Sequence, residues 1–445
     1  MARLKDILGI NARSADYLGL NFKVARKRAD DKILTKKMLR KFKIPHPKLI
    51  TKFGKLKRVR TYDWMMLEGG FVIKPAKGLG GTGVLVVRRK VKDVQDMWVL
   101  TTGKQVGQED LILHTLDIIE GRYSRNGLAD TAMVEERVKI HPKFRKLSAG
   151  GTPDVRVIVY NKIPVMAMLR LPTLESGGKA NLHQGAIGLG IDMATGITTY
   201  GVYKDQTVTR FPHTDKKVNG MVIPNWGAIL RIAVETAMAS KLNYLSIDFL
   251  LDFEKGPLVL ELNDQPGLSI QLANRAGLKK RLERVEGLEV ETVEQAVNIG
   301  RTLFASKFAG RVKRTLEGEL VVRNLETVQV AFGKKKRKTV LAKVDTGAYS
   351  TSVDRVLATE LGLLEKDNVL WEKEFKSSLG KEKRVLIRLV FWLGGRKVVS
   401  RAGISDRKNL RRKILIGRRD LKGFLIDPLR YKTDYRLKKG NEERN

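Results

Sequence analysis

The sequence contains no cysteine, which excludes disulfide bonds, thiolate catalysis and cysteine-based zinc sites. It also lacks long apolar runs, and no stretch approaches the roughly 20 residues that a membrane-spanning helix needs. The first residues, Met1–Leu8, lack the apolar segment and the cleavage site of a signal peptide. We therefore expect a cytoplasmic protein that makes no membrane contact.

Acidic residues are few relative to basic ones. The 48 Asp and Glu residues are outnumbered by 86 Lys and Arg residues, which gives a formal net charge of +38. A field of this size attracts polyanions of any kind. The basic residues are spread along the chain, and no helix-turn-helix, zinc finger or aromatic RNA-binding motif accompanies them. We expect any nucleic-acid binding to be non-specific, and ATP or an acidic peptide would be attracted equally well.

A chain of 445 residues is too long for one ordinary core, so we expect two or three domains. The composition turns strongly basic after Gly310, which marks a junction. We place a first domain at residues 1–308, a linker at 309–320, a second domain at 321–433 and a basic flexible tail at 434–445.

A glycine-rich segment joins two strand-like runs in the first domain, Phe71–Pro75 and residues 84–89. It is not a P-loop, because no Gly-Lys-Ser/Thr opens a helix, and a strand follows in place of the helix of a Rossmann turn. Such a hairpin can fold over a triphosphate through its backbone N–H groups, with Lys74 as a point charge; the alternative is an ordinary hairpin. The glycines are Gly78, Gly80, Gly81 and Gly83.

A second hairpin carries acidic residues. Its expected strands are residues 244–251 and 258–263, and alternation places Glu261 and Asn263 on one face. Folding about the turn brings Asp248 opposite Glu261. Two carboxylates and an amide on buried strands are costly unless they hold a cation, and their oxygens suit Mg²⁺. The alternative is a solvated strand face.

These two hairpins resemble the ATP-grasp fold, and more narrowly its α-L-glutamate ligase-like members, over about residues 1–305. The resemblance implies an α/β fold, ATP with Mg²⁺ or Mn²⁺ as cofactors, and carboxylate–amine ligation through an acyl phosphate. Further matching segments are Ile10–Arg13, Asp31–Lys32, Met133–Val138, Asp154–Arg156, Asn181–Gly185 and Glu261–Gly267.

The resemblance also implies a role for each polar residue. Residues that bind ATP would be Lys32, Lys74, Gly78, Gly80, Gly81, Gly83, Glu135, Glu136, Asp154 and Lys179. Residues that steady the transferring phosphoryl group and the acyl oxygen would be Arg156, Arg170, Lys179, Asn181 and His183. The metal ligands would be Asp248, Glu261 and Asn263. Alternatives stay open: a structural His183, a surface ion pair for Arg170, a solvated strand position for Glu135 and a helix-surface position for Lys32. The apolar periodicity of residues 229–238 predicts a core-packing helix without a functional role.

The second domain contains Asp345-Thr346-Gly347 directly after a strand-like run, residues 340–344. A later apolar run ends in Gly417, as expected of the strand that supports the Asp-Thr-Gly loop of aspartic proteases. Together these segments resemble a retropepsin-like domain over about residues 320–430, in the group named ATP-dependent zinc proteases. This implies a mainly-β fold in which Asp345, Thr346 and Gly347 form the catalytic loop.

No zinc is expected, because the sequence has no His-Glu-x-x-His and no histidine beyond His213. An aspartic protease needs two carboxylates that share a proton. A two-fold homodimer in which each chain contributes Asp345 supplies them, and Asp406 of the same chain is the alternative. Residues 377–380 form either a flap or a hairpin turn, and the lysine-rich run at 334–338 is expected at a hairpin tip.

The combined prediction is a fused enzyme. The first domain would add amino acids, with glutamate as the expected one, to a carboxylate of an acidic peptide or protein. The second would trim such additions. Two alternatives remain: an active ligase whose second domain only binds and dimerises, and a basic nucleic-acid-binding ATPase.

Overall fold

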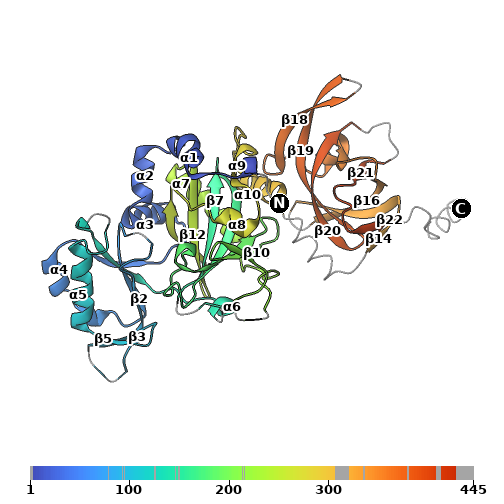
Figure 1. Cartoon of the computed structure of the whole chain (residues 1–445). Helices are drawn as coiled ribbons and strands as arrows, with labels where there is room; N and C mark the ends of the chain where they lie inside the picture. Colours follow the sequence, from blue (N-terminus) through green and yellow to red (C-terminus); the bar gives the residue numbers. More distant parts are fainter. Residues whose placement is uncertain are drawn as a thin grey trace, which may run out of the picture. The chain divides into compact units, whose positions relative to one another are not determined.

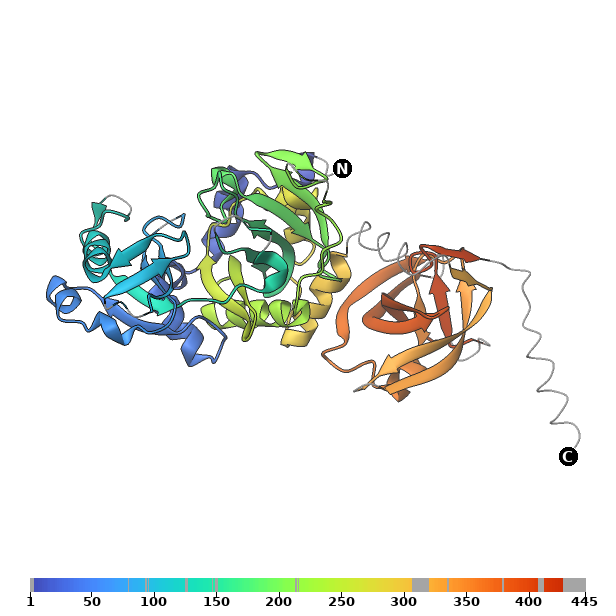
Figure 2. The same cartoon turned by 90° about the horizontal axis from the view of Figure 1, so that it is seen from below.

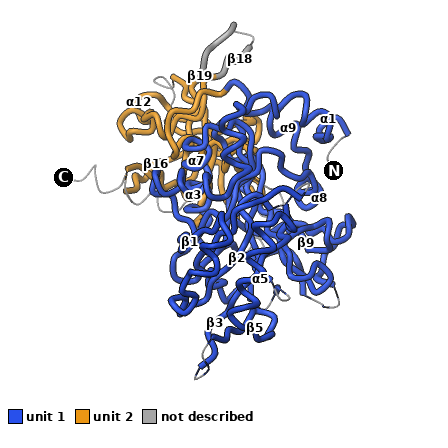
Figure 3. The backbone as a smooth tube through the Cα atoms, turned by 90° about the vertical axis from the view of Figure 1, so that its left-hand side faces the viewer, with its two compact units in different colours: residues 1–287 blue, residues 288–445 orange. Residues whose placement is uncertain are grey.

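The computed structural model describes residues 4–305 and 320–426, apart from residues 79, 93, 95, 125–126, 146, 149–150, 213, 215, 334–335, 378–379 and 407–411. The chain divides into two compact units, residues 1–287 and residues 288–445 (Figure 3). Unit 1 therefore ends before residue 308, where the sequence placed its end. The predicted linker up to residue 319 and the predicted tail lie outside the described residues.

Unit 1 contains an antiparallel six-stranded sheet in the order β1-β6-β2-β3-β4-β5. One helix, α5 (Gln108–Ile119), covers it with an apolar face, and Leu111 and Ile118 pack into the same core as Phe71 and Trp98. The sheet includes the predicted glycine-rich hairpin. Its strands are β1 (Leu49–Phe53), β2 (Phe71–Pro75), β3 (Leu85–Lys90), β4 (Met97–Leu100), β5 (Gln105–Gly107) and β6 (Ala132–Glu136).

The second sheet of unit 1 has seven strands in the order β11-β10-β9-β8-β7-β12-β13, so β11 and β13 form its edges. Every residue of β8 and of β12 is buried, as their long apolar runs require. The strands are β7 (Asp154–Tyr160), β8 (Ile163–Leu171), β9 (Ile187–Ile191), β10 (Thr198–Tyr203), β11 (Gln206–Val208), β12 (Tyr244–Asp252) and β13 (Gly256–Asn263).

Helices close both faces of this sheet (Figure 1). The predicted core-packing helix is confirmed as α7 (Trp226–Ser240), with Ile229 and Ala233 fully buried. On β9, Gly190 is required because a Cβ there would lie 2.3 Å from the carbonyl oxygen of Ala273 in α8. The remaining helices of unit 1 are α1 (Ile10–Ala12), α2 (Lys23–Ala29), α3 (Lys32–Lys41), α4 (Leu56–Arg60), α6 (Pro142–Arg145), α8 (Ile270–Asn274) and α9 (Leu278–Glu283).

Unit 2 is a β-barrel (Figure 2). Its seven-stranded sheet has the order β15-β16-β21-β17-β20-β19-β18, and a further pairing of β15 with β19 closes it. The elements of unit 2 are α10 (Val293–Leu303), β14 (Leu320–Val322), β15 (Leu325–Phe332), β16 (Lys336–Asp345), β17 (Ser352–Asp354), α12 (Arg355–Glu360), β18 (Val369–Ser377), β19 (Gly380–Leu393), β20 (Arg396–Ser405), β21 (Ile414–Gly417) and β22 (Phe424–Ile426).

The barrel interior follows from strict alternation along its strands. In β15 the buried positions are Glu326, Val328 and Val330, and the intervening side chains are exposed. Val328 and Val330 pack with Ala342, Val344 and the apolar side chains of the other strands in one core. The mainly-β prediction for the second domain is therefore confirmed. Of the lysine-rich run expected at a hairpin tip, residues 336–338 begin β16, which pairs with β15, and residues 334 and 335 lie outside the described residues.

Among the helices of the described residues, none is long and apolar enough to cross a membrane.

Candidate nucleotide and acyl-transfer site

The glycine-rich loop between β2 and β3 depends on backbone conformations that glycine favours. Gly80, Gly81 and Gly83 have φ values of +62°, +74° and +70°. A Cβ on Gly83 would also lie 2.6 Å from the ring of Tyr123, so this position needs glycine for space as well. The loop therefore presents backbone on its surface, as a phosphate-binding loop must.

Two lysines flank this loop. Lys32, the first residue of α3, donates from Nζ to the carbonyl oxygen of Gly78 at 2.7 Å. Lys32 is half-buried; burial lowers its pKa, and the Glu261 carboxylate acts in the opposite direction. Lys74 lies on β2 and is buried. Lys32 thus links the start of α3 to the glycine loop.

Glu135 on β6 is buried and forms ion pairs with two lysines. Lys74 Nζ contacts Oε1, and Lys36 Nζ lies 2.8 Å from Oε2. Lys36 also donates to the carbonyl oxygen of Pro47 at 2.5 Å. Burial alone would raise the pKa of Glu135, but Lys74 and Lys36 hold it below its usual range. The solvated position that was the alternative for Glu135 is therefore wrong.

The sequence did not single out Lys36. One signal was available, because Lys36 lies four residues after Lys32 and hence on the same face of α3. Thr35, Lys36, Met38 and Leu39 are the buried residues of this helix, so a lysine interrupts an otherwise uncharged buried set. A buried lysine requires a partner, and Glu135 supplies it.

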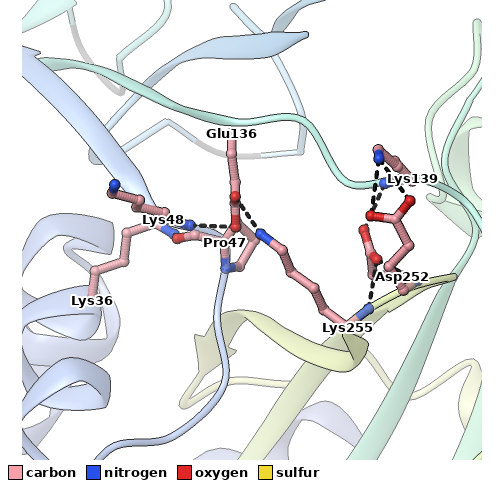
Figure 4. Close-up of polar contacts among 8 residues, drawn as sticks. Lys36, Pro47, Lys48, Glu136, Lys139, Asp252 and Lys255 are labelled. Atoms are coloured by element: carbon pink, nitrogen blue, oxygen red, sulfur yellow. Dashed lines mark hydrogen bonds and ion pairs between the residues drawn. The ribbon is translucent and has the colours of Figure 1, made fainter. Parts of the chain in front are cut away.

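Glu136, the next residue of β6, contacts neighbours on the other side of the strand (Figure 4). Its Oε1 accepts from the Lys48 N–H at 2.9 Å, and its Oε2 lies 2.5 Å from Lys255 Nζ in the β12–β13 turn. In the same group, the Lys139 N–H donates to Asp252 Oδ2 at 2.7 Å. These contacts tie the end of the six-stranded sheet to the turn of the acidic hairpin.

The acidic hairpin has the predicted register: Asp248 on β12 lies opposite Glu261 on β13, and Ser246 lies opposite Asn263. Asp248 is completely buried. On its other side, β12 pairs with β7 so that Asp248 lies opposite Arg156. Asp248 is therefore flanked by a carboxylate on one strand and a guanidinium on the other.

Two arginines and two aspartates form a connected network across β8, β7 and β12. Arg156 donates to both oxygens of Asp248, from Nε and from Nη2, at 2.7 Å each. Arg170 donates to both oxygens of Asp154 at 2.6 Å, and from Nη2 to Asp248 Oδ2 at 2.7 Å. Fork geometry of this kind fixes both guanidinium planes. Arg170 is buried, so its alternative assignment as a surface ion pair is wrong.

The network shifts the pKa values of the two aspartates in opposite directions. Burial would raise the pKa of Asp248, but Arg156 and Arg170 hold it well below its usual range. Burial raises the pKa of Asp154 above its usual range, and the neighbouring Asp248 carboxylate adds to this effect against the opposing charge of Arg170. The two arginines therefore favour the charged form of Asp248.

Asn263 supplies the third predicted ligand. Its Nδ2 is buried and has no hydrogen-bond partner among the described residues. Nitrogen and oxygen of a side-chain amide are assigned from their partners, and an amide turned over would place an oxygen at this orphaned position. The assignment of Asp248, Glu261 and Asn263 as ligands of a hard cation stays a prediction, because both oxygens of Asp248 accept hydrogen bonds from Arg156 and Arg170. Within the described ranges, no group of three or more His, Asp or Glu side chains lies close enough together to hold a metal ion.

The segment between β8 and β9 lies against the glycine loop. A Cβ built on Gly80 would be 3.9 Å from Asn181 Nδ2, and one on Gly81 would be 3.7 Å from Lys179 Cγ. Asn181 Oδ1 accepts from the His183 N–H at 3.1 Å, and His183 itself is exposed. The structure therefore brings Lys179 and Asn181 to the loop, and residues 176–178 form an ordered turn beside them.

In unit 2, Asp345 ends β16 opposite Gly417 of β21. Its Oδ1 accepts from the Gly347 N–H at 3.0 Å and the Ala348 N–H at 3.3 Å. Burial opposes ionisation, but these N–H groups and Lys343 hold the pKa of Asp345 below its usual range. A Cβ on Gly417 would lie 2.5 Å from the backbone of Ser350, so this glycine lets the Asp-Thr-Gly loop pack on β21. Thr346 is exposed.

Asp406, the alternative partner, lies elsewhere in the barrel. It follows β20, whose last residue, Ser405, pairs with Asp354. The preceding residue of β17, Val353, pairs with Ile414 at the start of β21, whereas Asp345 lies at the end of β21. Asp406 and Asp345 are therefore at opposite ends of this strand. Ser377 and Gly380 pair at the end of the β18–β19 hairpin, and the two residues between them lie outside the described part of the chain.

The profile of the family described as sugar-transfer-associated ATP-grasp matches residues 12–287. The chain belongs to this ATP-grasp family. No curated protein matches it. The narrower resemblance to glutamate ligases remains a prediction, as does the retropepsin-like assignment of the barrel.

Solved structures similar to this ATP-grasp protein include the ATP-grasp ligase PsnB complexed with a minimal precursor, at 15% identity and a TM-score of 0.33, covering 59% of this chain and 61% of that chain. The chain thus corresponds to about 61% of the length of PsnB. The D-alanine-D-alanine ligase from Coxiella burnetii has 13% identity and a TM-score of 0.34, covering 66% of this chain and 63% of that chain. A protein of unknown function from Legionella pneumophila has 17% identity and a TM-score of 0.18, covering 26% of this chain and 98% of its own length.

Proposed function

We propose that unit 1 is an ATP- and Mg²⁺-dependent carboxylate–amine ligase that adds amino acids, with glutamate as the expected one, to an acidic peptide or protein. One observation carries the proposal: a buried network of arginines and aspartates adjoins Glu261, and Lys32, whose pKa responds to the Glu261 carboxylate, donates to the glycine-rich loop. Cations and carboxylates so arranged suit a polyphosphate with its metal ion. The protein would use free amino acid as its second substrate.

The metal, Mg²⁺ or Mn²⁺, would be held by Asp248, Glu261 and Asn263, and would neutralise charge on the ATP phosphates. Zinc is not proposed, since the donors are hard oxygens. Lys74 and the backbone of the glycine loop would bind phosphate oxygens. Lys36 keeps Glu135 neutralised, so Lys74 can turn to a phosphate without leaving a buried unpaired carboxylate.

The proposed reaction has two steps. A carboxylate oxygen of the acceptor attacks the γ-phosphorus of ATP, the bond to the bridging oxygen breaks, and ADP leaves. The amine of the incoming amino acid then attacks the acyl carbon, loses a proton and expels inorganic phosphate. Arg156 and Arg170, held rigid by Asp248 and Asp154, would stabilise the negative charge that builds on the transferring group. Lys179, Asn181 and His183 would act from the loop beside it.

For unit 2 we propose an aspartic peptidase that trims the added residues and works as a homodimer. Asp345 is supported by two backbone N–H groups and by the glycine at the end of the neighbouring strand. One chain provides one Asp-Thr-Gly loop, and Asp406 lies at the far end of β21, so a second copy is the source of the second carboxylate.

Mass spectrometry of acidic acceptor peptides incubated with the protein, Mg²⁺-ATP and single amino acids tests both proposals. We expect ladders of added residues with the wild type, none with Glu261→Ala, and longer ladders with Asp345→Asn. Glu254→Ala, an exposed glutamate in the β12–β13 turn, is the matched control and should behave as the wild type. Absence of any mass shift despite nucleotide binding would overturn the ligase proposal. Ladders unchanged by Asp345→Asn would leave unit 2 as a binding module.

A further inference from the structure

A cavity of about 380 Å³ lies beside α2, outside the residues assigned above. Its lining consists almost entirely of charged side chains from three segments: α2, the connection to α3, and the residue that precedes the glycine loop. They are Lys23, Arg26, Lys27, Asp30, Asp31 and Lys77. The volume is in the range of small-ligand pockets.

The basic pocket carries more positive than negative charge, with four basic and two acidic side chains in its lining. Among the described residues, the ammonium groups of Lys23, Lys27 and Lys77 make no hydrogen bond or ion pair. Asp31 caps α3: its Oδ1 accepts hydrogen bonds from the N–H groups of Ile33 and Leu34. Lys23, Lys27 and Lys77 are exposed and line the same cavity, so an anionic ligand placed there could pair with more than one of them.

Two residues that line the basic pocket, Arg26 and Lys77, are connected to residues of the proposed site. On one side, Arg26 Nε donates to Asp264 Oδ2 at 2.6 Å, and Asp264 directly follows Asn263. On the other side, Lys77 directly precedes Gly78, whose carbonyl oxygen accepts from Lys32. A ligand in the pocket therefore lies next to the phosphate loop and next to the metal-binding strand without occupying either.

We propose that the basic pocket binds a carboxylate of the acidic acceptor, one that is not itself activated. The inference rests on the proposed ligase function and adds the subsite that would select an acidic chain. Lys23, Lys27 and Lys77 form the charge contacts, and Asp264 holds Arg26 in place beside them. Asp30 and Asp31 limit the charge that the pocket accepts, which favours a carboxylate monoanion over a phosphate dianion.

The test is fluorescence anisotropy of labelled hexaglutamate, with hexaglutamine as the uncharged probe, at about 0.1 M salt and saturating Mg²⁺ and a non-hydrolysable ATP analogue. We expect the double variant Lys23→Gln/Lys27→Gln to raise the Kd for hexaglutamate at least tenfold and to leave nucleotide affinity within twofold of the wild type. Lys57→Gln, an exposed lysine on α4, is the control for loss of charge from a strongly basic chain and should change neither. Inorganic phosphate at constant ionic strength should not displace the peptide.

Four results would overturn the inference: no binding of hexaglutamate by the wild type, equal affinity in the double variant, an equal loss with Lys57→Gln, or displacement by phosphate. A parallel loss of nucleotide affinity would assign the pocket to ATP and would also contradict it. Peptide binding needs no turnover. Pocket-dependent binding without ligation would therefore count against the ligase proposal and not against the subsite.

Discussion

Glu135 lies between the ammonium groups of Lys36 and Lys74, and all three side chains are buried. Removing one member of such a group leaves uncompensated charge in a low-dielectric environment, which costs about 3–5 kcal/mol. We expect Glu135→Gln to lower the free energy of unfolding by that amount at pH 7. Urea denaturation followed by tryptophan fluorescence measures it.

The pH dependence of this cost has a definite sign. The pKa of Glu135 is depressed in the folded protein, so its contribution is fully present above the unfolded pKa of about 4.3 and is lost as the pH falls through the folded value. The difference between wild type and Glu135→Gln should therefore shrink below about pH 4. The adjacent Glu136, half-exposed in its pair with Lys255, is the control, and Glu136→Gln should cost less than about 1 kcal/mol. Equal costs for the two variants would contradict the assignment of Glu135 as the buried partner.

At the scale of elements, two glycines with positive φ, one inside and one outside the glycine loop, allow the cost of backbone strain to be measured apart from an effect on nucleotide binding. Gly81 has a φ of +74° at the proposed phosphate site, and Gly103 has a φ of +90° in the turn between β4 and β5, where a Cβ would meet nothing within 4 Å. Alanine at either position imposes a similar conformational cost of about 1–2 kcal/mol. We expect Gly81→Ala to weaken Mg²⁺-nucleotide binding about tenfold and Gly103→Ala to leave it unchanged, as measured by titration with a fluorescent ATP analogue. If both variants changed the nucleotide affinity equally, the effect of Gly81→Ala would come from lost stability and not from the phosphate site.

Local patterns predicted the elements that carry the site. Strand alternation and one turn suffice to place Asp248 opposite Glu261, because a hairpin pairs residues that are close in sequence. The contact of Arg170 with Asp248 was not predictable in this way. It joins β8 to β12 across β7, and the order of strands in a sheet is not contained in the periodicity of any one strand. The ion pair of Lys36 was not predictable either, because its partner Glu135 lies on a distant element, β6.

The domain boundary likewise depends on packing between distant segments, which local composition does not reveal. Composition placed the end of the first domain at 308, just before the basic segment that follows Gly310, whereas the first compact unit ends at Gly287. Packing decides which unit a helix joins, and α10 belongs to the unit that begins at Leu288. A helix with an apolar face looks the same in sequence whichever core it covers.

At the scale of the whole molecule, the net charge of +38 makes some affinity for any polyanion unavoidable. The nucleic-acid alternative predicts binding that falls steeply with salt and no amino-acid-stimulated ATP turnover. A ligase with an acidic acceptor predicts salt-sensitive peptide binding together with such turnover. Charge alone therefore does not separate the two functions, but the dependence of ATP turnover on a free amino acid does.

Two compact units predict two unfolding transitions. A ligand that binds only native unit 1 stabilises only that unit, by about 2.7 kcal/mol at a hundredfold excess over Kd, so Mg²⁺-nucleotide should raise one Tm by about 5 °C and leave the other unchanged.

Conversely, Gly417→Ala, whose Cβ would overlap the backbone of Ser350, should lower only the second Tm. Gly403→Ala, a position in β20 where a Cβ meets nothing within 4 Å, is the matched control in the same barrel. Differential scanning calorimetry resolves these cases, and a nucleotide that raised both transitions equally would show that the units unfold as one.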